Sequence, residues 1–376
     1  MLNKENSMKK FSVVACLVVL AAVLISACAA PATQAPAPAA PAAPAAPAAP
    51  KSVVDGKKLA FVLFSFDGYQ QGQGSWFKKY AEDEGATVTL IDGKANAEVQ
   101  LKAMEDALAT KPDGIVWHVV NGPAAVNALK AAQAAKVPVV VAGSRPDPQT
   151  GVTVPFVQLY DYEIAKQGGK QAAEWLKANK PGEKAKLVYF DRTGVIHCEK
   201  YRGDGFIAGV TEVMGKENVE IVFRDGVTAS QDASLAKMED LLQAKPDFNM
   251  FWGCGATHVM GGLKALEEAG RGKAVNGVPV TEFIMSIDGT PEEILKLLDP
   301  NSAVKATIGL TPKENAAKHF ATLKRILSGE LALNDNITVL APGSLLPIDC
   351  VKLNEYLSTE YAGVKGYEPV DCTKFK

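Results

Sequence analysis

Basic runs and nucleotide-binding loops are absent from this sequence of 376 residues. Its 40 lysine and arginine residues are interspersed with 42 acidic residues, and the formal net charge is −2. Without a basic stripe, we expect no nucleic-acid partner. The chain also lacks the Gly-x-x-x-x-Gly-Lys phosphate loop and the Gly-x-Ser-x-Gly nucleophile turn. These absences remove two common routes to nucleotide and acyl-transfer chemistry.

Two partial patterns are too incomplete to indicate an enzyme. Gly253–His258 follows a predicted strand and opens a predicted helix, but His258 stands where a dinucleotide fingerprint needs its third glycine. Asp67 and Asp288 could pair as acid and base, yet no nucleophile pattern accompanies them, so a role in accepting hydrogen bonds fits them better. We therefore expect no catalytic residue and no cofactor.

Long apolar runs are confined to the N-terminus. Met8–Lys10 is basic, and Phe11–Ile25 is apolar over the length of a signal-peptide core, which is too short to span a bilayer. The small residues at 26 and 27 before Cys28 resemble the lipobox of bacterial lipoproteins. We predict a signal peptide over 1–27 and lipidation of Cys28. The alternative is an ordinary secretory signal, cleaved near residue 27 or 29.

Alanine and proline make up nearly all of residues 29–50. Proline favours extended polyproline II, and a tract without apolar periodicity has nothing to bury. We predict a tether over 28–56 that holds a folded domain away from a membrane surface. The protein is then expected outside the cytoplasm, anchored in the cell envelope through Cys28.

Cysteine is scarce in the remaining chain. The four cysteines after the tether are Cys198, Cys254, Cys350 and Cys372. An even number in an exported protein suggests disulfides, although the sequence alone permits three pairings. We favour a bond between Cys350 and Cys372 that would clasp the C-terminal tail. A bond between Cys198 and Cys254 is the second possibility, and free thiols are the alternative.

A zinc site is the other interpretation of the soft donors. His197, Cys198, Cys254 and His258 lie on two loops that could approach each other. Adjacent His-Cys is unusual ligand spacing, and an oxidising compartment favours disulfides over thiolates. We therefore expect no bound metal.

From residue 58 onward, strand and helix patterns alternate. The predicted strands are 59–64, 87–91, 114–118, 138–142, 186–190, 219–223 and 248–252. The predicted helices are 74–84, 97–109, 124–135, 162–178, 200–214, 230–243 and 256–268. The strands are continuous apolar runs, which is typical of parallel sheets covered on both faces. Glycines at 68, 72 and 74 are expected to form a flexible loop in a cleft wall.

The pattern repeats once. Leu101–Leu108, followed by Lys-Pro-Asp and Trp117, has a counterpart in Leu235–Leu242, followed by Lys-Pro-Asp and Trp252. A single repeat predicts two similar Rossmann-like lobes with parallel, doubly wound sheets. In such sheets ligands bind beyond the carboxyl ends of the strands, so two sheets side by side create a binding crevice. Both tryptophans lie in apolar strand runs and are expected in the core.

Several segments resemble the periplasmic sugar-binding proteins of bacterial ABC importers, of the ribose, xylose and galactofuranose type. They are Ile287–Pro291, Val137–Val141 running into Arg145, Arg202–Phe206, and Ala306–Ile308 before a helix at Thr311. The resemblance implies the type I periplasmic binding protein fold with a three-segment hinge near Tyr160, Gly309 and Pro342. One lobe would comprise 57–160 and 310–342, and the other 161–309 and 343–376.

The resemblance also implies a ligand set. Carried over by position, it comprises Asp67, Tyr69, Gln70, Gln71, His118, Ser144, Arg145, Lys200 and Asp288. Arg145 and Asp288 keep the family's residue types and can serve neighbouring hydroxyls as donor and acceptor. Polar groups replace the aromatic rings expected after the first strand.

The function implied is capture of a monosaccharide or polyol by hinge closure and delivery to an ABC-transporter permease by a monomeric protein. Two alternatives keep the fold. A receptor could present its closed form to a membrane sensor kinase, or the ligand could be a nucleoside.

Overall fold

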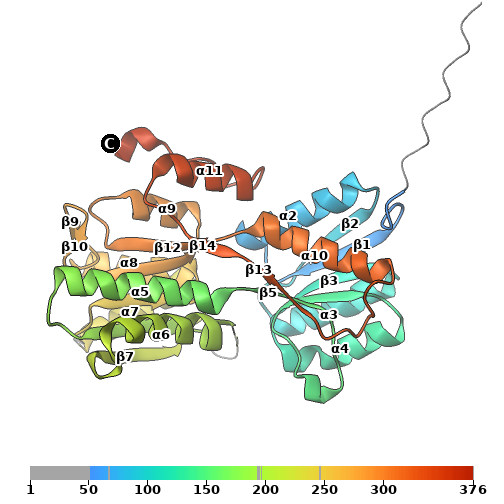
Figure 1. The fold of residues 1–376 in the computed structure, drawn as a ribbon, viewed down its shortest axis with the longest axis horizontal. Coiled ribbons are helices and arrows are strands. Elements are labelled where there is room, and N and C mark those ends of the chain that lie inside the picture. The colour runs from blue at the N-terminus through green and yellow to red at the C-terminus, as the bar shows by residue number, and fades with distance from the viewer. Residues whose placement is uncertain (1–50, 67, 193–194, 196, 245–246, 376) are drawn as a thin grey trace, which may run out of the picture. The chain divides into compact units, whose positions relative to one another are not determined.

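The computed structural model describes residues 51–66, 68–192, 195, 197–244 and 247–375 (Figure 1). Its first sheet has the strand order β13-β5-β4-β3-β1-β2, with all neighbours parallel. The strands are β1 (Lys58–Leu63), β2 (Thr87–Asp92), β3 (Gly114–Val119), β4 (Val139–Gly143), β5 (Phe156–Leu159) and β13 (Thr338–Ala341). The helices of this lobe are α2 (Gly68–Asp83), α3 (Ala97–Ala109), α4 (Gly122–Ala134), α10 (Pro312–Leu327) and the short η1 (Pro148–Thr150).

The second sheet has the order β14-β12-β11-β8-β6-β7, and β14 alone runs antiparallel to its neighbour. Its strands are β6 (Ala185–Asp191), β7 (Val219–Gly226), β8 (Met250–Gly253), β11 (Phe283–Asp288), β12 (Val304–Leu310) and β14 (Gly343–Leu345). The helices are α5 (Asp161–Asn179), the π-helical η2 (His197–Gly203), α6 (Asp204–Met214), η3 (Lys216–Asn218), α7 (Gln231–Gln243), α8 (Ala256–Glu268), α9 (Pro291–Leu298), α11 (Cys350–Glu360) and η4 (Cys372–Phe375). A small hairpin joins β9 (Ala274–Val275) to β10 (Val278–Pro279).

Each sheet is covered on both faces, which explains the continuous apolar strands. In β3, Trp117 packs with residues of α3 and α4, whereas its neighbour Val116 packs with α2 and α10. In β8, Trp252 faces α5 and α6, and Phe251 faces α7 and α8. Successive strand residues point to opposite faces, so both must be apolar. Trp117 and Trp252 are buried, as predicted.

The chain passes between the two sheets three times, after β5, after β12 and after β13. The first sheet is therefore built from two separate stretches of sequence. Two lobes with parallel, doubly wound sheets confirm the predicted fold class. Among the helices of the described ranges, none is both long and apolar enough to cross a bilayer.

The prediction that Gly68, Gly72 and Gly74 form a flexible loop after β1 was wrong. Helix α2 begins at Gly68, six residues before the predicted start, and includes Gly72 and Gly74. A Cβ at Gly72 would press against Pro312 and Tyr361, and a Cβ at Gly74 against leucines of the first sheet. These glycines allow close packing of a helix, which composition alone does not distinguish from a turn.

Candidate functional site

A cavity of about 750 Å³ lies at the carboxyl ends of the strands of both sheets. Its walls come from the ends of β3 and β4, from the segments after β1, β2, β6, β8 and β11, and from hinge residues next to β5 and β12. This is where open parallel sheets place ligands. The volume is of the size expected for a small-molecule site.

Gln100 of α3 fixes the first lobe's edge of the cavity. Its Nε2 donates hydrogen bonds to the carbonyls of Leu63, at 3.0 Å, and His118, at 2.7 Å. Its Oε1 accepts from the backbone N–H of Val120 at 2.8 Å. One buried amide therefore ties the ends of β1 and β3 together.

Gln70 and His118 present a neutral polar pair to the cavity. Gln70 Nε2 lies 3.0 Å from His118 Nδ1, and Gln70 Oε1 accepts from Phe64 N–H at 3.4 Å. Burial lowers the pKa of His118 to about 3, with further lowering by His319 and Arg202. The imidazole is therefore uncharged at neutral pH and can both donate and accept hydrogen bonds.

Tyr69 and Asn315 form a second polar pair in the same lobe. Asn315 Nδ2 donates to the Tyr69 hydroxyl oxygen over 2.6 Å, and both residues line the cavity. Burial, followed by the charge of Asp161, raises the pKa of Tyr69. The phenol therefore keeps its proton across the physiological range.

Arg202 provides the buried cation of the site. Its Nε donates to Asp161 Oδ1 at 3.0 Å, Nη1 lies 3.8 Å from Asp288 Oδ1, and Nη1 also donates to the carbonyl of Cys254. Burial alone lowers the pKa of Arg202, but Asp161 and Asp288 outweigh it, so the pKa is raised overall. The guanidinium is charged and largely neutralised by its two carboxylates.

Asp288 ends β11 in a strained conformation, with φ of +115°. Its Oδ2 accepts from the N–H of Ala256, the first residue of α8, at 3.0 Å. Its carbonyl accepts from the hydroxyls of Tyr356 at 3.2 Å and Tyr361 at 3.1 Å. Such strain in a residue other than glycine persists where surrounding contacts hold it, and it is concentrated at functional sites.

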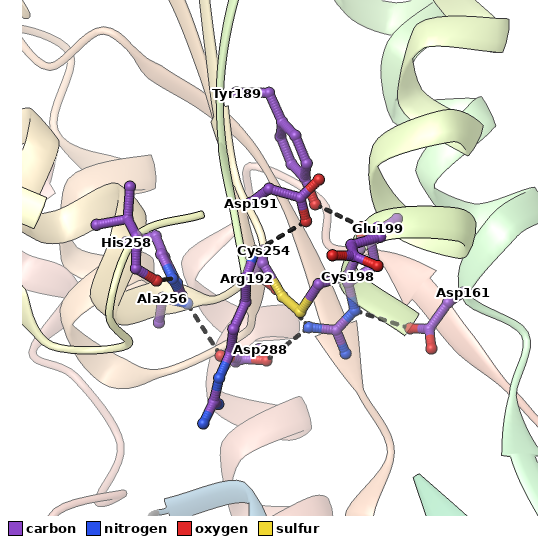
Figure 2. The surroundings of a disulfide bond; sticks show 12 residues. Asp161, Tyr189, Asp191, Arg192, Cys198, Glu199, Cys254, Ala256, His258 and Asp288 are labelled. Carbon is purple, nitrogen blue, oxygen red and sulfur yellow. Dashed lines mark hydrogen bonds and ion pairs between the residues drawn. A yellow bond between two sulfur atoms is a disulfide. The ribbon is translucent and has the colours of Figure 1, made fainter. Parts of the chain in front are cut away.

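A disulfide joins Cys198 to Cys254 in the cavity wall. Figure 2 shows this bond together with Asp161, Asp288 and Tyr189. The Tyr189 hydroxyl donates to the carbonyl of Cys198 at 2.8 Å. The bond links the start of η2, which carries Arg202, to the segment after β8.

The candidate metal ligands meet at this same disulfide. His197, Cys198 and Cys254 have donor atoms within 4.8 Å of one another, and among the described residues no other group of this kind is found. The two sulfur atoms are bonded to each other. Neither sulfur is then a thiolate, which is the form that binds metal. His258 is not part of this group, and its Nε2 lies 3.1 Å from the carbonyl of Val227.

Four of the residues implied by the family resemblance line the cavity: Tyr69, Gln70, His118 and Asp288. Asp67 lies outside the described residues. Gln71 instead donates from Nε2 to the carbonyl of Phe66 at 2.7 Å. The cavity thus gathers polar groups from both lobes.

Ser144, Arg145 and Lys200 do not line this cavity. Ser144 is buried and its N–H donates to the carbonyl of Val119 at 2.9 Å, while Lys200 is exposed. Arg145 Nη1 donates to Thr338 Oγ1 at 3.0 Å, and its guanidinium lies 5.3 Å from the centre of the Phe156 ring. Gly143, two residues before Arg145, has a φ of +74°. The chain after this turn places the Arg145 side chain beside Thr338 of β13.

Sequence reasoning missed Arg202 and Asp161 as site residues. Arg202 lies in the Arg202–Phe206 segment that carries the family resemblance, but position-by-position transfer selected Lys200, two residues earlier. The π-helical turn η2 is wider than an α-helical turn and changes which side chain points inward. A buried arginine also needs a buried acid, and that requirement could have pointed to Asp161 at the hinge.

The chain is similar in sequence to curated sugar-import proteins. The family model described as "Periplasmic binding protein domain" matches residues 59–331. The ribose import binding protein of Escherichia coli (strain K12) is 26% identical over 259 residues, covering 67% of this chain and 78% of the relative. The D-apiose import binding protein of Actinobacillus succinogenes is 25% identical over 218 residues, covering 58% of this chain and 67% of the relative.

Solved structures share the fold at lower identity. A galactofuranose binding protein superposes with a TM-score of 0.65 at 21% identity, covering 81% of this chain and all of that one. An ABC transporter solute binding protein from Bacillus halodurans C-125 with bound myo-inositol gives a TM-score of 0.64 at 14% identity, with coverage of 81% and 98%.

Proposed function

This chain belongs to the periplasmic binding protein domain family, and from that premise we propose that it is a lipid-anchored solute-binding protein. It captures a monosaccharide or polyol and delivers it to an ABC-transporter permease. Sugar binding in the service of ABC importers is the function of its relatives, which are solute-binding proteins and not enzymes. The lipid anchor and the permease are the further steps of the proposal.

The arrangement around Arg202 carries the proposal. A hydroxyl group both donates and accepts hydrogen bonds, so a polyol needs fixed donors beside fixed acceptors. Arg202 donates, Asp288 accepts, and the neutral Gln70–His118 pair can do both. Because two carboxylates balance the one buried guanidinium, the site favours an uncharged ligand over an anion.

Three buried polar atoms in cavity-lining residues add to this support. His197 Nδ1, His258 Nδ1 and Asn315 Oδ1 have no hydrogen-bond partner within the described part of the chain. A buried polar atom without a partner costs about 1–3 kcal/mol. A ligand with several hydroxyl groups can satisfy such atoms and would be selected over one with a missing hydroxyl.

Hinge closure follows from the distribution of these groups. Gln70 and His118 belong to the first lobe, whereas Arg202 and Asp288 belong to the second. A ligand that contacts both sets gains all its hydrogen bonds only when the lobes are closed, so it shifts the population toward that state. The closed form is then the one offered to the permease.

A nucleoside is the second candidate ligand, because aromatic rings also line the cavity. They are Phe64, Phe66, Tyr69, Tyr201 and Tyr367. Base stacking on such rings would add to the hydrogen bonds of the ribose hydroxyls. The polar pairs described above favour the sugar or polyol.

A thermal-shift screen of the full chain in detergent tests the proposal. The probes are D-ribose, L-arabinose, D-galactose, myo-inositol, allitol, adenosine and L-amino acids. A ligand that binds the folded state raises the melting temperature by mass action. We expect a shift with one sugar or polyol and its loss in Asp288→Asn. A shift with adenosine alone would favour the nucleoside, and one with amino acids alone would overturn the proposal.

A further inference from the structure

The chain continues beyond the family match, which ends at residue 331. Helix α11 and the tail after it form a segment over 350–372 whose ends are joined by the Cys350–Cys372 disulfide (Figure 1). Within it, Asn354 Oδ1 accepts from Val370 N–H at 2.7 Å, and Asn354 Nδ2 donates to the carbonyl of Val370 at 2.9 Å. We call residues 350–372 the clasped segment.

The clasped segment contacts both lobes. In the second lobe, its apolar side chains pack against those of α9 in a buried cluster. The cluster comprises Ile294, Leu297, Leu346, Leu353, Leu357, Tyr361 and Val364. In the first lobe, Trp76 Nε1 donates to the carbonyl of Glu360 at 2.8 Å, and Lys313 N–H donates to Glu360 Oε2 at 3.1 Å. These contacts hold the clasped segment against both lobes, with Gly366 and Tyr367 in the cavity lining.

Two of its tyrosines support the strained aspartate of the site. The hydroxyls of Tyr356 and Tyr361 both donate to the carbonyl of Asp288, whose φ is +115°. Tyr361 also stacks on Tyr367, with ring centres 4.2 Å apart and planes inclined by 19°. Tyr361 bonds to Asp288 and Tyr367 lines the cavity, so the stacked pair connects the two.

Tyr367 reaches the cavity and meets the first lobe there. It is one of the lining residues, together with Gly366. A Cβ added at Gly68, the first residue of α2, would overlap the phenol ring of Tyr367. Glycine at 68 thus leaves the space that the ring occupies.

We infer that the clasped segment is part of the ligand site, and that Tyr367 supplies an aromatic wall that selects for cyclic ligands. An aromatic face packs against the apolar C–H face of a ring, whereas an open-chain polyol offers no such flat face. This inference rests on the proposed function for the class of ligand. The placement of Tyr367 against Gly68 can be tested without any ligand.

A double-mutant cycle tests the placement. The full chain in detergent is compared with Gly68→Ala, Tyr367→Ala and the double variant by thermal unfolding. We expect Gly68→Ala to lower the melting temperature by about 2 °C or more in the native background. In the Tyr367→Ala background the same change should have little effect, because the colliding ring is gone. Equal effects in both backgrounds would overturn the inference.

The affinity profile tests ligand selection. Tyr367→Ala should weaken binding of a cyclic probe, D-ribose or myo-inositol, by about tenfold while changing the affinity for allitol less. Tyr367→Phe keeps the ring and should stay within about threefold. Lys365→Ala, an exposed change in the same segment, is the control and should match the native chain. An unchanged profile in Tyr367→Ala would overturn the inference while leaving the proposed function intact.

The clasp is tested by replacing both of its cysteines. Cys350→Ser/Cys372→Ser should reproduce part of the loss of cyclic-probe affinity, since the bond holds the tail against α11. If the native chain binds none of the probes, the proposed function fails, and the double-mutant cycle alone then decides whether Tyr367 forms the cavity wall.

Discussion

Arg202 donates from Nε to Asp161 Oδ1 over 3.0 Å, and the two side chains are only 6% and 4% exposed. Asp161 is the first residue of α5, directly after the chain leaves the first sheet. The pair therefore connects the cavity wall to the hinge. Removing one partner of such a buried pair leaves the other charge without compensation, which typically costs about 3–5 kcal/mol.

Replacing Arg202 should damage both binding and stability. We expect Arg202→Ala to weaken ligand binding at least tenfold and to lower the free energy of unfolding by about 3–5 kcal/mol. Titration calorimetry with the ligand found in the screen and urea unfolding measure the two effects. Arg325→Ala is the control, because its ion pair with Glu330 is exposed and should contribute at most about 1 kcal/mol.

The companion variant Arg145→Ala decides which arginine serves the ligand. Arg145 is bonded to Thr338 outside the cavity, so its loss should change the affinity by no more than about twofold. The resemblance to sugar-binding proteins predicts the opposite order. A large loss of affinity in Arg145→Ala with little effect of Arg202→Ala would favour that assignment and contradict the one drawn from the cavity.

The Cys198–Cys254 disulfide should affect stability and binding together. It closes a loop across a sequence separation of 56, which corresponds to about 4 kcal/mol in the chain-entropy account. It also holds the carbonyl of Cys254, which accepts from Arg202. We expect Cys198→Ser/Cys254→Ser to be less stable in urea and to bind the ligand more weakly. Full affinity in this variant would mean that Arg202 keeps its position without the bond.

Cys28 should determine where the protein is found in the cell. We expect the native chain to incorporate radiolabelled palmitate and to sediment with membranes, as one lipid-modified cysteine in a lipobox requires. Cys28→Ser should lose the label and appear in the soluble extracytoplasmic fraction. Cys16→Ser, a cysteine inside the apolar run, is the matched control. Membrane association of Cys28→Ser would show that another feature anchors the chain.

Much of the fold could be predicted because burial imposes periodicity. The helix predicted at 97–109 matches α3, since Asn96 caps its start and Lys111-Pro112 follows its end. The predicted strands also match to within three residues, because apolar runs reflect sheets that are covered on both faces. The single repeat of the strand and helix pattern predicted the two lobes.

The site could be predicted only in part. His118 and Asp288 stand at the ends of strands, where topology alone places them at the cavity. Lys200 was chosen where Arg202 lines the cavity, because a π-helical turn shifts the register. No sequence pattern pointed to Tyr367 as a cavity residue. It reaches Gly68 only because the C-terminal tail folds back and is held by the Cys350–Cys372 disulfide.

Acid should destabilise the protein, because its four histidines stay unprotonated in the folded state. Burial lowers the pKa of His118 to about 3 and that of His258 and His319 to about 4, against 6.5 for an ordinary histidine. Burial also holds the pKa of His197 well below 6.5. Below pH 6.5 the unfolded chain therefore binds protons that the folded chain does not. For these groups, stability is present above pH 6.5 and is lost progressively as the pH falls toward 4.

Glu293 opposes this trend, and the balance can be measured. Burial, followed by the charge of Asp288, raises the pKa of Glu293 to about 8, so the folded chain holds one proton that the unfolded chain releases above pH 4.5. Four protons against one leave a net uptake of three on unfolding. Urea unfolding should then show a loss of about 4 kcal/mol per pH unit between pH 6 and 5. Glu293→Gln removes the opposing group and should steepen the slope by about 1.4 kcal/mol per unit. A stability that stays constant over this range would contradict the assignment of four neutral histidines.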